Sequence, residues 1–308
     1  MKPLARLCKT LIRNSKRTKD KMPALIDLRR RIRSVRNTQQ ITQAMKTVST
    51  AKLKKSQRAV LEGRPYWHNL PALLTRLTCW VEEEHPLLLR REEKKIEGVV
   101  ITSDKGLCGA FNSNLLTRAL SFFEEKARQR EVSLVLIGKK AVNFFKRYYF
   151  PIDRVHADRV DKLGAQDLKE IAQYLMNLYI LSRRDAIYIV YNEFKSIISP
   201  RLTITRLLPL SPEKSDEAQD LWLPDWDPES KIIFKFLLPL YIEKEILHCF
   251  FESLAAEHAS RMMAMDNATK NAEELILDLI LILNKIRQAS ITKELLEIMT
   301  AVEALSKS

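Results

Sequence analysis

The sequence predicts an α/β domain inserted between two long helices that pair as an antiparallel coiled coil. Two stretches without Gly or Pro, residues 24–62 and 241–305, carry apolar side chains every three or four positions, as helices packed lengthwise do. Between them, short runs rich in β-branched residues alternate with helical patterns, which indicates a largely parallel, Rossmann-like sheet. Because the two helical stretches lie at opposite ends of the chain, everything else must be an insertion at one end of a helical hairpin.

The C-terminal stretch is the longer of the two. Its 65 residues would form a helix on the order of 100 Å long at about 1.5 Å per residue. If both helices start at the α/β domain, roughly 20 residues, about 286–305, have no internal partner. The segment just before them, ELILDLILILNKI, is apolar on nearly all sides, so we expect other proteins to enclose this end of the chain.

Length and composition are those of a protein with a sizeable core. The chain has 308 residues, and 46% of them are apolar. The four cysteines stand singly, which indicates a reducing compartment and no structural zinc site. No apolar run reaches the roughly 18 residues of a membrane span, so the chain is expected to be soluble or held at a membrane only through partners.

Positive charge is concentrated near the N-terminus. Residues 1–21 carry eight Lys or Arg against one acid, and residues 22–62 carry ten against two. Since the whole chain has a net charge of +14, the remaining 246 residues sum to −1. A solvated helix face, a nucleic-acid-binding helix and a positive track facing acidic protein loops all stay open. No helix-turn-helix, zinc-finger or RNA-binding signature accompanies the charge.

Local signals place the elements in order. Residues 1–21 lack the apolar core of a secretory signal, and we expect a disordered tail or a true start at Met22. Gly63, Pro65 and Pro71 predict that the first helix is interrupted after Glu62, with a shorter helix over 72–84 that Pro86 ends. The predicted strands are 96–103, 132–138, 185–194 and 201–208, and helical patterns cover 115–130, 141–149 and 165–182.

These signals divide the chain into six parts. They are a basic N-terminal extension (1–21), a first coiled-coil helix (22–65), a connecting helical segment (66–95), the α/β domain (96–208), an acidic connector (209–231) and a last coiled-coil helix (232–308).

One loop, SDKGLCGAFNSN at 103–114, could be mistaken for an active site because it directly follows a strand. Its glycine spacing fits neither a P-loop nor a dinucleotide fingerprint. Cys108 would need a positioned base to act as a nucleophile, and the five histidines form no triad pattern; an enzyme of this kind would show thiolate reactivity. We predict instead that Cys108 is a small buried side chain in a tight turn, and that this chain has no active site, cofactor or metal of its own.

Three separated groups of residues resemble the gamma subunit of F-type ATP synthases. They are DLRRRIRSVRNTQQITQAMKTVSTAKL (27–53), ITSDKGLCGAFNSNL (101–115), and the closing motifs EHASRMMAMDNAT (257–269) and RQASITKELLEI (287–298). The resemblance implies a central shaft inside a hexamer of alternating alpha and beta subunits, with the α/β domain against the epsilon subunit and the membrane ring of c subunits. It implies one copy per complex, peripheral on the cytoplasmic face of a bacterial cell membrane or on an organelle inner membrane.

The resemblance also implies partner contacts. Met45 and Lys46 match the family's contact with acidic lever loops of the catalytic subunits, and the shaft's upper contacts are matched by Arg261, Gln288, Thr292 and Glu294. Residues 299–303, MTAVE, depart from the small residues with which the family usually ends, so the contacts of the tip are expected to differ. The implied function is torque transmission for ATP synthesis and proton transport, with ATP and magnesium bound by the partners. The alternative is a basic coiled coil that binds nucleic acid.

Overall fold

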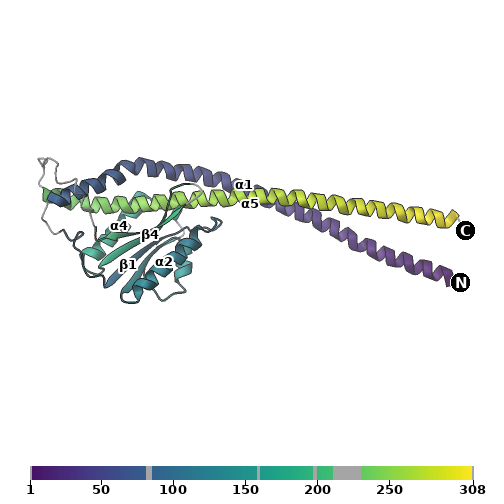
Figure 1. The fold of residues 1–308 in the computed structure, drawn as a ribbon, viewed down its shortest axis with the longest axis horizontal. Coiled ribbons are helices and arrows are strands. Elements are labelled where there is room, and N and C mark those ends of the chain that lie inside the picture. Colours follow the sequence, from purple (N-terminus) through teal and green to yellow (C-terminus); the bar gives the residue numbers. More distant parts are fainter. Residues whose placement is uncertain (1, 81–84, 158–159, 197–199, 211–229, 307–308) are drawn as a thin grey trace. The chain divides into compact units, whose positions relative to one another are not determined.

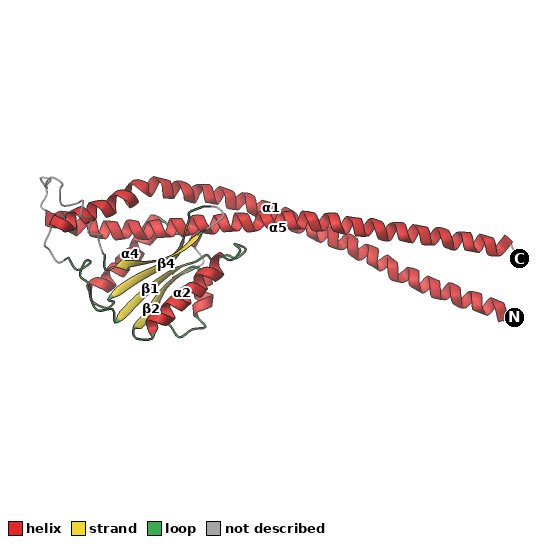
Figure 2. Cartoon of the chain, viewed as in Figure 1, coloured by secondary structure: helices red, strands yellow, loops and turns green. Residues whose placement is uncertain are grey.

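The computed structural model describes residues 2–80, 85–157, 160–196, 200–210 and 230–306. Helix α1 (Lys2–Trp80) and helix α5 (Ser230–Ser306) stand at the two ends of the chain, and a five-stranded sheet lies between them in sequence (Figures 1 and 2). The chain divides into two compact units: residues 1–45 with 265–308, here called the helical unit, and residues 46–264, here called the sheet unit. An α/β domain between terminal helices is therefore confirmed.

The sheet has the strand order β3-β2-β1-β4-β5. Strand β1 (Lys95–Ile101) pairs in parallel with β2 (Glu131–Ile137) and with β4 (Ala186–Glu193), and β2 pairs in parallel with β3 (Ile152–His156). Strand β5 (Arg201–Leu208) runs antiparallel to β4. The connections contain α2 (Phe111–Ala127), α3 (Lys139–Phe145), the short 3₁₀ helix η1 (Val160–Lys162) and α4 (Ala165–Ile180).

Both faces of the sheet are covered, because successive side chains of a strand point to opposite faces. In β1, Val99 and Ile101 pack against α4 and the start of α5, whereas Ile96 and Val100 pack against α2 and α3. Figure 1 shows α2 and α4 on the two sides of the sheet. Burial on both faces explains why apolar residues predominate in β1 (KIEGVVI) and β2 (EVSLVLI).

The four predicted strands are present, with bounds that differ by at most two residues, but β3 was missed. Its burial is low along most of its length, as expected of a strand at the edge of the sheet, so it lacks the apolar alternation that marks a half-buried strand. The expectation of a largely parallel sheet is confirmed, with β5 as the antiparallel exception.

The predicted interruption of the first helix was wrong. Helix α1 continues through Gly63, Pro65 and Pro71 to Trp80, so no separate helix begins at residue 72. Proline removes one helical hydrogen bond, and burial of neighbouring turns against the sheet unit outweighs that loss, since Val60, Leu70 and Leu74 are buried. Helix α5 likewise contains Pro239 and begins at Ser230. The Trp-containing connector at 211–229 lies outside the described residues.

The helical unit is held together by apolar side chains from both of its segments. Ile32 of α1 lies in one buried cluster with Ile276 and Leu279 of α5. Further along, the hydroxyl of Thr269 donates a hydrogen bond to the hydroxyl of Thr42 at 2.8 Å. Since the α1 partner rises in number as the α5 partner falls, these segments run antiparallel.

Candidate functional site at the loop after the first strand

The loop that follows β1 is closed by its own side chains. Asn112, in the first turn of α2, accepts a hydrogen bond from the main-chain N–H of Ser103 at 3.2 Å, and its amide donates to the sulfur of Cys108 at 3.0 Å. The hydroxyl of Ser103 donates to the main-chain oxygen of Lys105 at 2.7 Å. Leu107 takes a left-handed conformation with φ 62°, and its side chain is 63% exposed. The loop is therefore a tight, internally bonded turn with an exposed apolar tip.

Asp104 joins this loop to two other segments. One of its carboxylate oxygens accepts from the N–H of Lys139 at 2.9 Å, and the other accepts from the N–H of Val160 at 2.9 Å. These donors lie at the starts of α3 and η1, where main-chain N–H groups lack helical partners. The approach is close: a Cβ on Gly138, which has φ +101°, would lie 2.2 Å from the main-chain oxygen of Thr102.

Arg261 of α5 fastens the loop to that helix. Its Nε donates to the main-chain oxygen of Gly106 at 3.3 Å, and Nη2 donates to that of Lys105 at 3.2 Å. The remaining Nη1 pairs with Glu257, one turn earlier, at 2.7 Å. Both charged residues are buried, Arg261 to 8% exposure and Glu257 to 4%, so the guanidinium is occupied on all sides by groups of this chain.

Helix α1 joins the same place through an ion pair. Lys52 contacts the carboxylate of Asp161 in η1, which lowers the pKa of that carboxyl even though burial raises it. His258 lies buried beside Arg261, and burial lowers the pKa of its imidazole to about 4. His258 is therefore neutral at neutral pH. The charged side chains that hold the loop after β1, η1, α1 and α5 together include Lys52, Asp161, Glu257 and Arg261; we call this place the junction.

Cys108 is not placed to act as a nucleophile. Cys108 is 1% exposed, and burial raises the pKa of its thiol, so the reactive thiolate is disfavoured. The predicted burial of Cys108 in a tight turn is confirmed. What the arrangement can do is mechanical: directional bonds tie the loop to α3, η1 and α5, and an ion pair ties η1 in turn to α1.

The structure brings only one predicted contact residue to this junction, Arg261. Met45 and Lys46 lie half-buried on α1, while Gln288, Thr292 and Glu294 lie exposed on α5. Their contacts with partner subunits stay predictions. Sequence reasoning missed Lys52, Asp161 and Glu257; of these, Glu257 stands four residues before Arg261, a spacing that could have revealed the ion pair.

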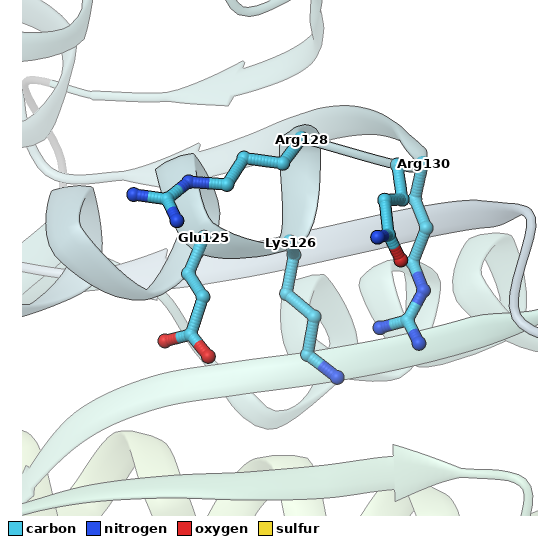
Figure 3. Close-up of a pocket in the computed structure, with 5 residues that line it drawn as sticks. Glu125, Lys126, Arg128 and Arg130 are labelled. Carbon is cyan, nitrogen blue, oxygen red and sulfur yellow. The ribbon is translucent and has the colours of Figure 1, made fainter.

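A second candidate is a surface hollow of about 410 Å³ at the end of α2, lined by Glu125, Lys126, Arg128, Gln129 and Arg130 (Figure 3). Two of its cations are occupied by one acid: Glu93 pairs with Lys126 at 3.2 Å and with Arg130 at 3.0 Å. Glu93 also accepts from the hydroxyl of Tyr188 at 2.8 Å, and these bonds lower the pKa of its carboxyl. The hollow is lined by three cationic side chains and one acidic one, so its net charge is positive.

Among the residues that the structure describes, no group of three or more His, Cys, Asp or Glu side chains is arranged to hold a metal ion. No helix in the same part of the chain is long and apolar enough to cross a membrane.

Comparison with known proteins supplies the family. The sequence model of the family described as ATP synthase matches residues 24–305. The ATP synthase gamma chain of Pelotomaculum thermopropionicum is 43% identical over 286 residues, which cover 92% of this chain and 100% of that protein. The chain belongs to the ATP synthase gamma chain family. The predicted resemblance is thus confirmed, and the nucleic-acid alternative finds no support in these comparisons.

Solved structures share the fold of the family. A chain in the Euglena gracilis mitochondrial ATP synthase, described as OSCP, F1 and c-ring, matches with a TM-score of 0.63 and 20% identity, covering 92% of this chain and 94% of its own length. A chain in the rotor of the same enzyme matches with a TM-score of 0.59 and 19% identity, covering 87% and 99%. Three of the gamma chain motifs, 27–53, 101–115 and 257–269, contribute residues to the junction described above: Lys52, Cys108 and Arg261.

Proposed function

We propose that this chain is the central rotor shaft of a proton-translocating ATP synthase. It transmits torque between the membrane ring of c subunits and a catalytic hexamer of alpha and beta subunits, in ATP synthesis coupled to proton transport. Membership in the gamma chain family carries this proposal. The finer fold that goes with it is an antiparallel coiled coil of the two terminal helices, with a Rossmann-like α/β domain inserted between them in sequence.

The surface of α5 in the helical unit supports enclosure by other subunits. Outside the cluster with Ile32, large apolar side chains of α5 are exposed; they include Leu277, Leu281, Leu295, Leu296, Ile298 and Met299 at 56–69% exposure. Such a row on a single helix is typical of a surface that partners cover. Torque is transmitted when each rotor position stabilises a different conformation of the surrounding catalytic sites, so coupling is a difference in binding free energy.

Five of the six predicted contact residues carry this coupling, since the guanidinium of Arg261 is already bonded within this chain. In this proposal Lys46 and Met45 face the acidic lever loops, and Gln288, Thr292 and Glu294 meet the upper hexamer. Gln288 and Thr292, four residues apart, lie on one face of α5 and expose polar groups that can form and break hydrogen bonds as the shaft turns. The chain itself performs no chemistry, and ATP and magnesium bind its partners.

The epsilon subunit and the c-ring are the partners of the sheet unit in this proposal. The complex places one copy of the chain peripherally on the cytoplasmic face of a bacterial cell membrane, or on an organelle inner membrane.

Reconstitution tests the proposal. The chain from Met22, mixed with separate alpha and beta subunits, is expected to form a complex with one copy per hexamer and to restore magnesium-dependent ATP hydrolysis. Failure to assemble, together with tight, salt-sensitive binding of DNA or RNA, would instead favour the basic coiled-coil alternative.

A charge reversal then tests the contact on α1. In vesicles, Lys46→Glu is expected to lower ATP-driven proton pumping relative to hydrolysis while the complex stays assembled, because a repelled lever loop no longer follows the shaft. Lys55→Glu is the matched control, since a residue nine positions on lies about 180° around the same helix. Equal pumping by both variants would remove Lys46 from the set of coupling contacts.

A further inference from the structure

Basic residues from three distant segments meet at one edge of the sheet. Because β1, β2 and β4 are parallel, the segments that lead into them all lie at one end of the sheet, the end at which these three strands begin. These segments are 90–95 (RREEKK), 126–130 (KARQR) and 183–185 (RRD), which together hold nine Lys or Arg and three Asp or Glu. Main-chain hydrogen bonds join them: Glu131 N–H donates to the oxygen of Lys94 at 2.9 Å, and Asp185 N–H to that of Lys95 at 2.7 Å. We call this surface the basic edge.

The acids of the basic edge are occupied within it. Glu92 pairs with Lys94 at 3.0 Å, and Glu93 is held by Lys126 and Arg130. The carboxylate of Asp185 accepts from the main-chain N–H groups of Lys94 at 3.1 Å and Lys95 at 2.8 Å. Three arginines, Arg90, Arg128 and Arg183, are exposed and have no ion-pair partner within the described parts of the chain. The outward charge of the edge is therefore positive.

Exposed apolar side chains lie among these cations. Leu89 is 40% exposed, Ile180 42% and Leu181 62%. They are neighbours in the fold, because the hydroxyl of Tyr179 donates to the main-chain oxygen of Leu89 and Arg91 donates to that of Tyr179 at 2.8 Å. Cations that flank bare Leu and Ile side chains are typical of surfaces that rest at the boundary between lipid headgroups and acyl chains.

The hollow of Figure 3 lies within the basic edge. In that view Lys126 and Arg130 extend side by side, and Arg128 extends away from them along the end of α2. The hollow's volume of about 410 Å³ is large enough for a phosphate group with part of its substituent. Guanidinium groups bind phosphate oxygens with two parallel hydrogen bonds, which suits Arg128 and Arg130 to such a group.

We propose that the basic edge contacts an anionic phospholipid surface, with Arg90, Arg128 and Arg183 bound to lipid phosphates and Leu89 and Leu181 among the headgroups. A diffuse positive charge around an apolar patch suits a lateral array of phosphates, which imposes no fixed partner shape. Since one Lys or Arg at such a surface strengthens binding about fivefold, the three free arginines together contribute on the order of a hundredfold. The proposal rests on the proposed function only because its test uses the assembled complex.

Lipid-borne quenchers test this contact directly. With the native cysteines replaced by alanine, a fluorophore is attached at Gln129→Cys in the basic edge, or at Leu107→Cys, the exposed tip after β1 at the opposite edge. The labelled complex is reconstituted into phosphatidylcholine vesicles, with or without phosphatidylglycerol, that carry a spin-labelled headgroup. The label at position 129 is expected to be quenched more strongly with phosphatidylglycerol and less at high salt, whereas the label at 107 stays unquenched in both.

Charge reversal separates lipid binding from other causes. Arg90→Glu, Arg128→Glu and Arg183→Glu together are expected to abolish the quenching that depends on phosphatidylglycerol. Arg118→Glu, ten residues before Arg128 on α2 and about 15 Å away along the helix, is expected to leave it unchanged. Unchanged quenching in the triple variant, equal quenching in both kinds of vesicle, or shielding from solvent without lipid quenching would each overturn the proposal; the last would assign the edge to a protein partner.

Proton pumping by the same vesicles keeps the two proposals apart. Complexes that pump while the label at position 129 stays unquenched overturn the lipid contact alone. If no complex forms, the proposed function fails, and the same labels on the isolated full chain, mixed with the same vesicles, decide whether the basic edge meets lipid.

Discussion

Replacing Arg261 with methionine should be among the most damaging single changes in the sheet unit. The substitution removes a buried guanidinium that pairs with Glu257 at 2.7 Å and donates to two loop oxygens at 3.3 and 3.2 Å. It leaves Glu257 buried without its cation, and breaking one partner of a buried pair costs about 3–5 kcal/mol. We therefore expect the free energy of unfolding to fall by about that amount at neutral pH.

The loss should depend on pH in a defined direction. Burial already raises the pKa of Glu257, and Arg261 opposes that rise. Without Arg261, the folded-state pKa moves further above the unfolded value, so the variant is relatively more stable at low pH and loses stability as pH rises through the raised pKa. Urea unfolding of the full chain, followed by circular dichroism at about pH 5 and pH 8, should show the larger deficit at the higher pH.

A second variant makes the reasoning refutable. Glu257→Leu combined with Arg261→Met removes both charges, so it should be more stable than Arg261→Met alone, by about 2 kcal/mol. Lys270→Met is the matched control, because Lys270 forms an ion pair of the same spacing with Asp266 at 2.9 Å but is 67% exposed, and its loss should cost less than about 1 kcal/mol. A double variant no more stable than the single one, or a single variant no worse than the control, would refute the account.

Three further predictions concern glycine, packing and protonation. Gly138→Ala should cost about 3 kcal/mol of unfolding free energy, since φ is +101° and the new Cβ meets a main-chain oxygen at 2.2 Å, whereas Gly106→Ala, whose Cβ meets only a lysine side chain at 3.7 Å, should cost less; equal losses would contradict the geometry. Ile276→Ala should lower the free energy of unfolding by about 2 kcal/mol, and Leu277→Ala, at its exposed neighbour, by less than about 0.5 kcal/mol, as measured by thermal unfolding. Equal losses would show that the buried cluster does not stabilise the helical unit. Burial raises the pKa of Glu97 to about 7 in the folded chain, so the contribution of Glu97 to the free energy of unfolding is fully present below the pKa of the unfolded state and declines as pH rises towards 7. Glu97→Gln should flatten this decline when the free energy of unfolding is measured between about pH 4 and pH 8. An unchanged dependence on pH would assign the decline to another group.

The sequence was sufficient for elements whose signal is local and periodic. The apolar spacing of residues 241–305 predicted α5, and runs rich in β-branched and other apolar residues predicted β1, β2 and β4, because both faces of these strands are largely covered by apolar side chains. The family resemblance was available for the same reason: its motifs are contiguous in the chain.

Local signals failed where packing competes with them. Gly63 and Pro65 predicted a helix end, yet α1 continues because burial of the surrounding turns outweighs the missing hydrogen bond. Strand β3 was missed because an edge strand with exposed side chains carries little apolar alternation. In both cases the deciding free energy comes from contacts with residues that are distant in sequence.

Charge shows most clearly what only the tertiary structure decided. The sequence established that residues 63–308 sum to −1, and it fixed which segments are basic. A net charge does not say where charged residues lie in the fold, however. It could not show that segments 90–95, 126–130 and 183–185 lie together at one end of the sheet, or that Arg261 would be buried against the loop after β1. Parallel strand pairing and the docking of α5 made those placements, because they bring together residues that no local pattern connects.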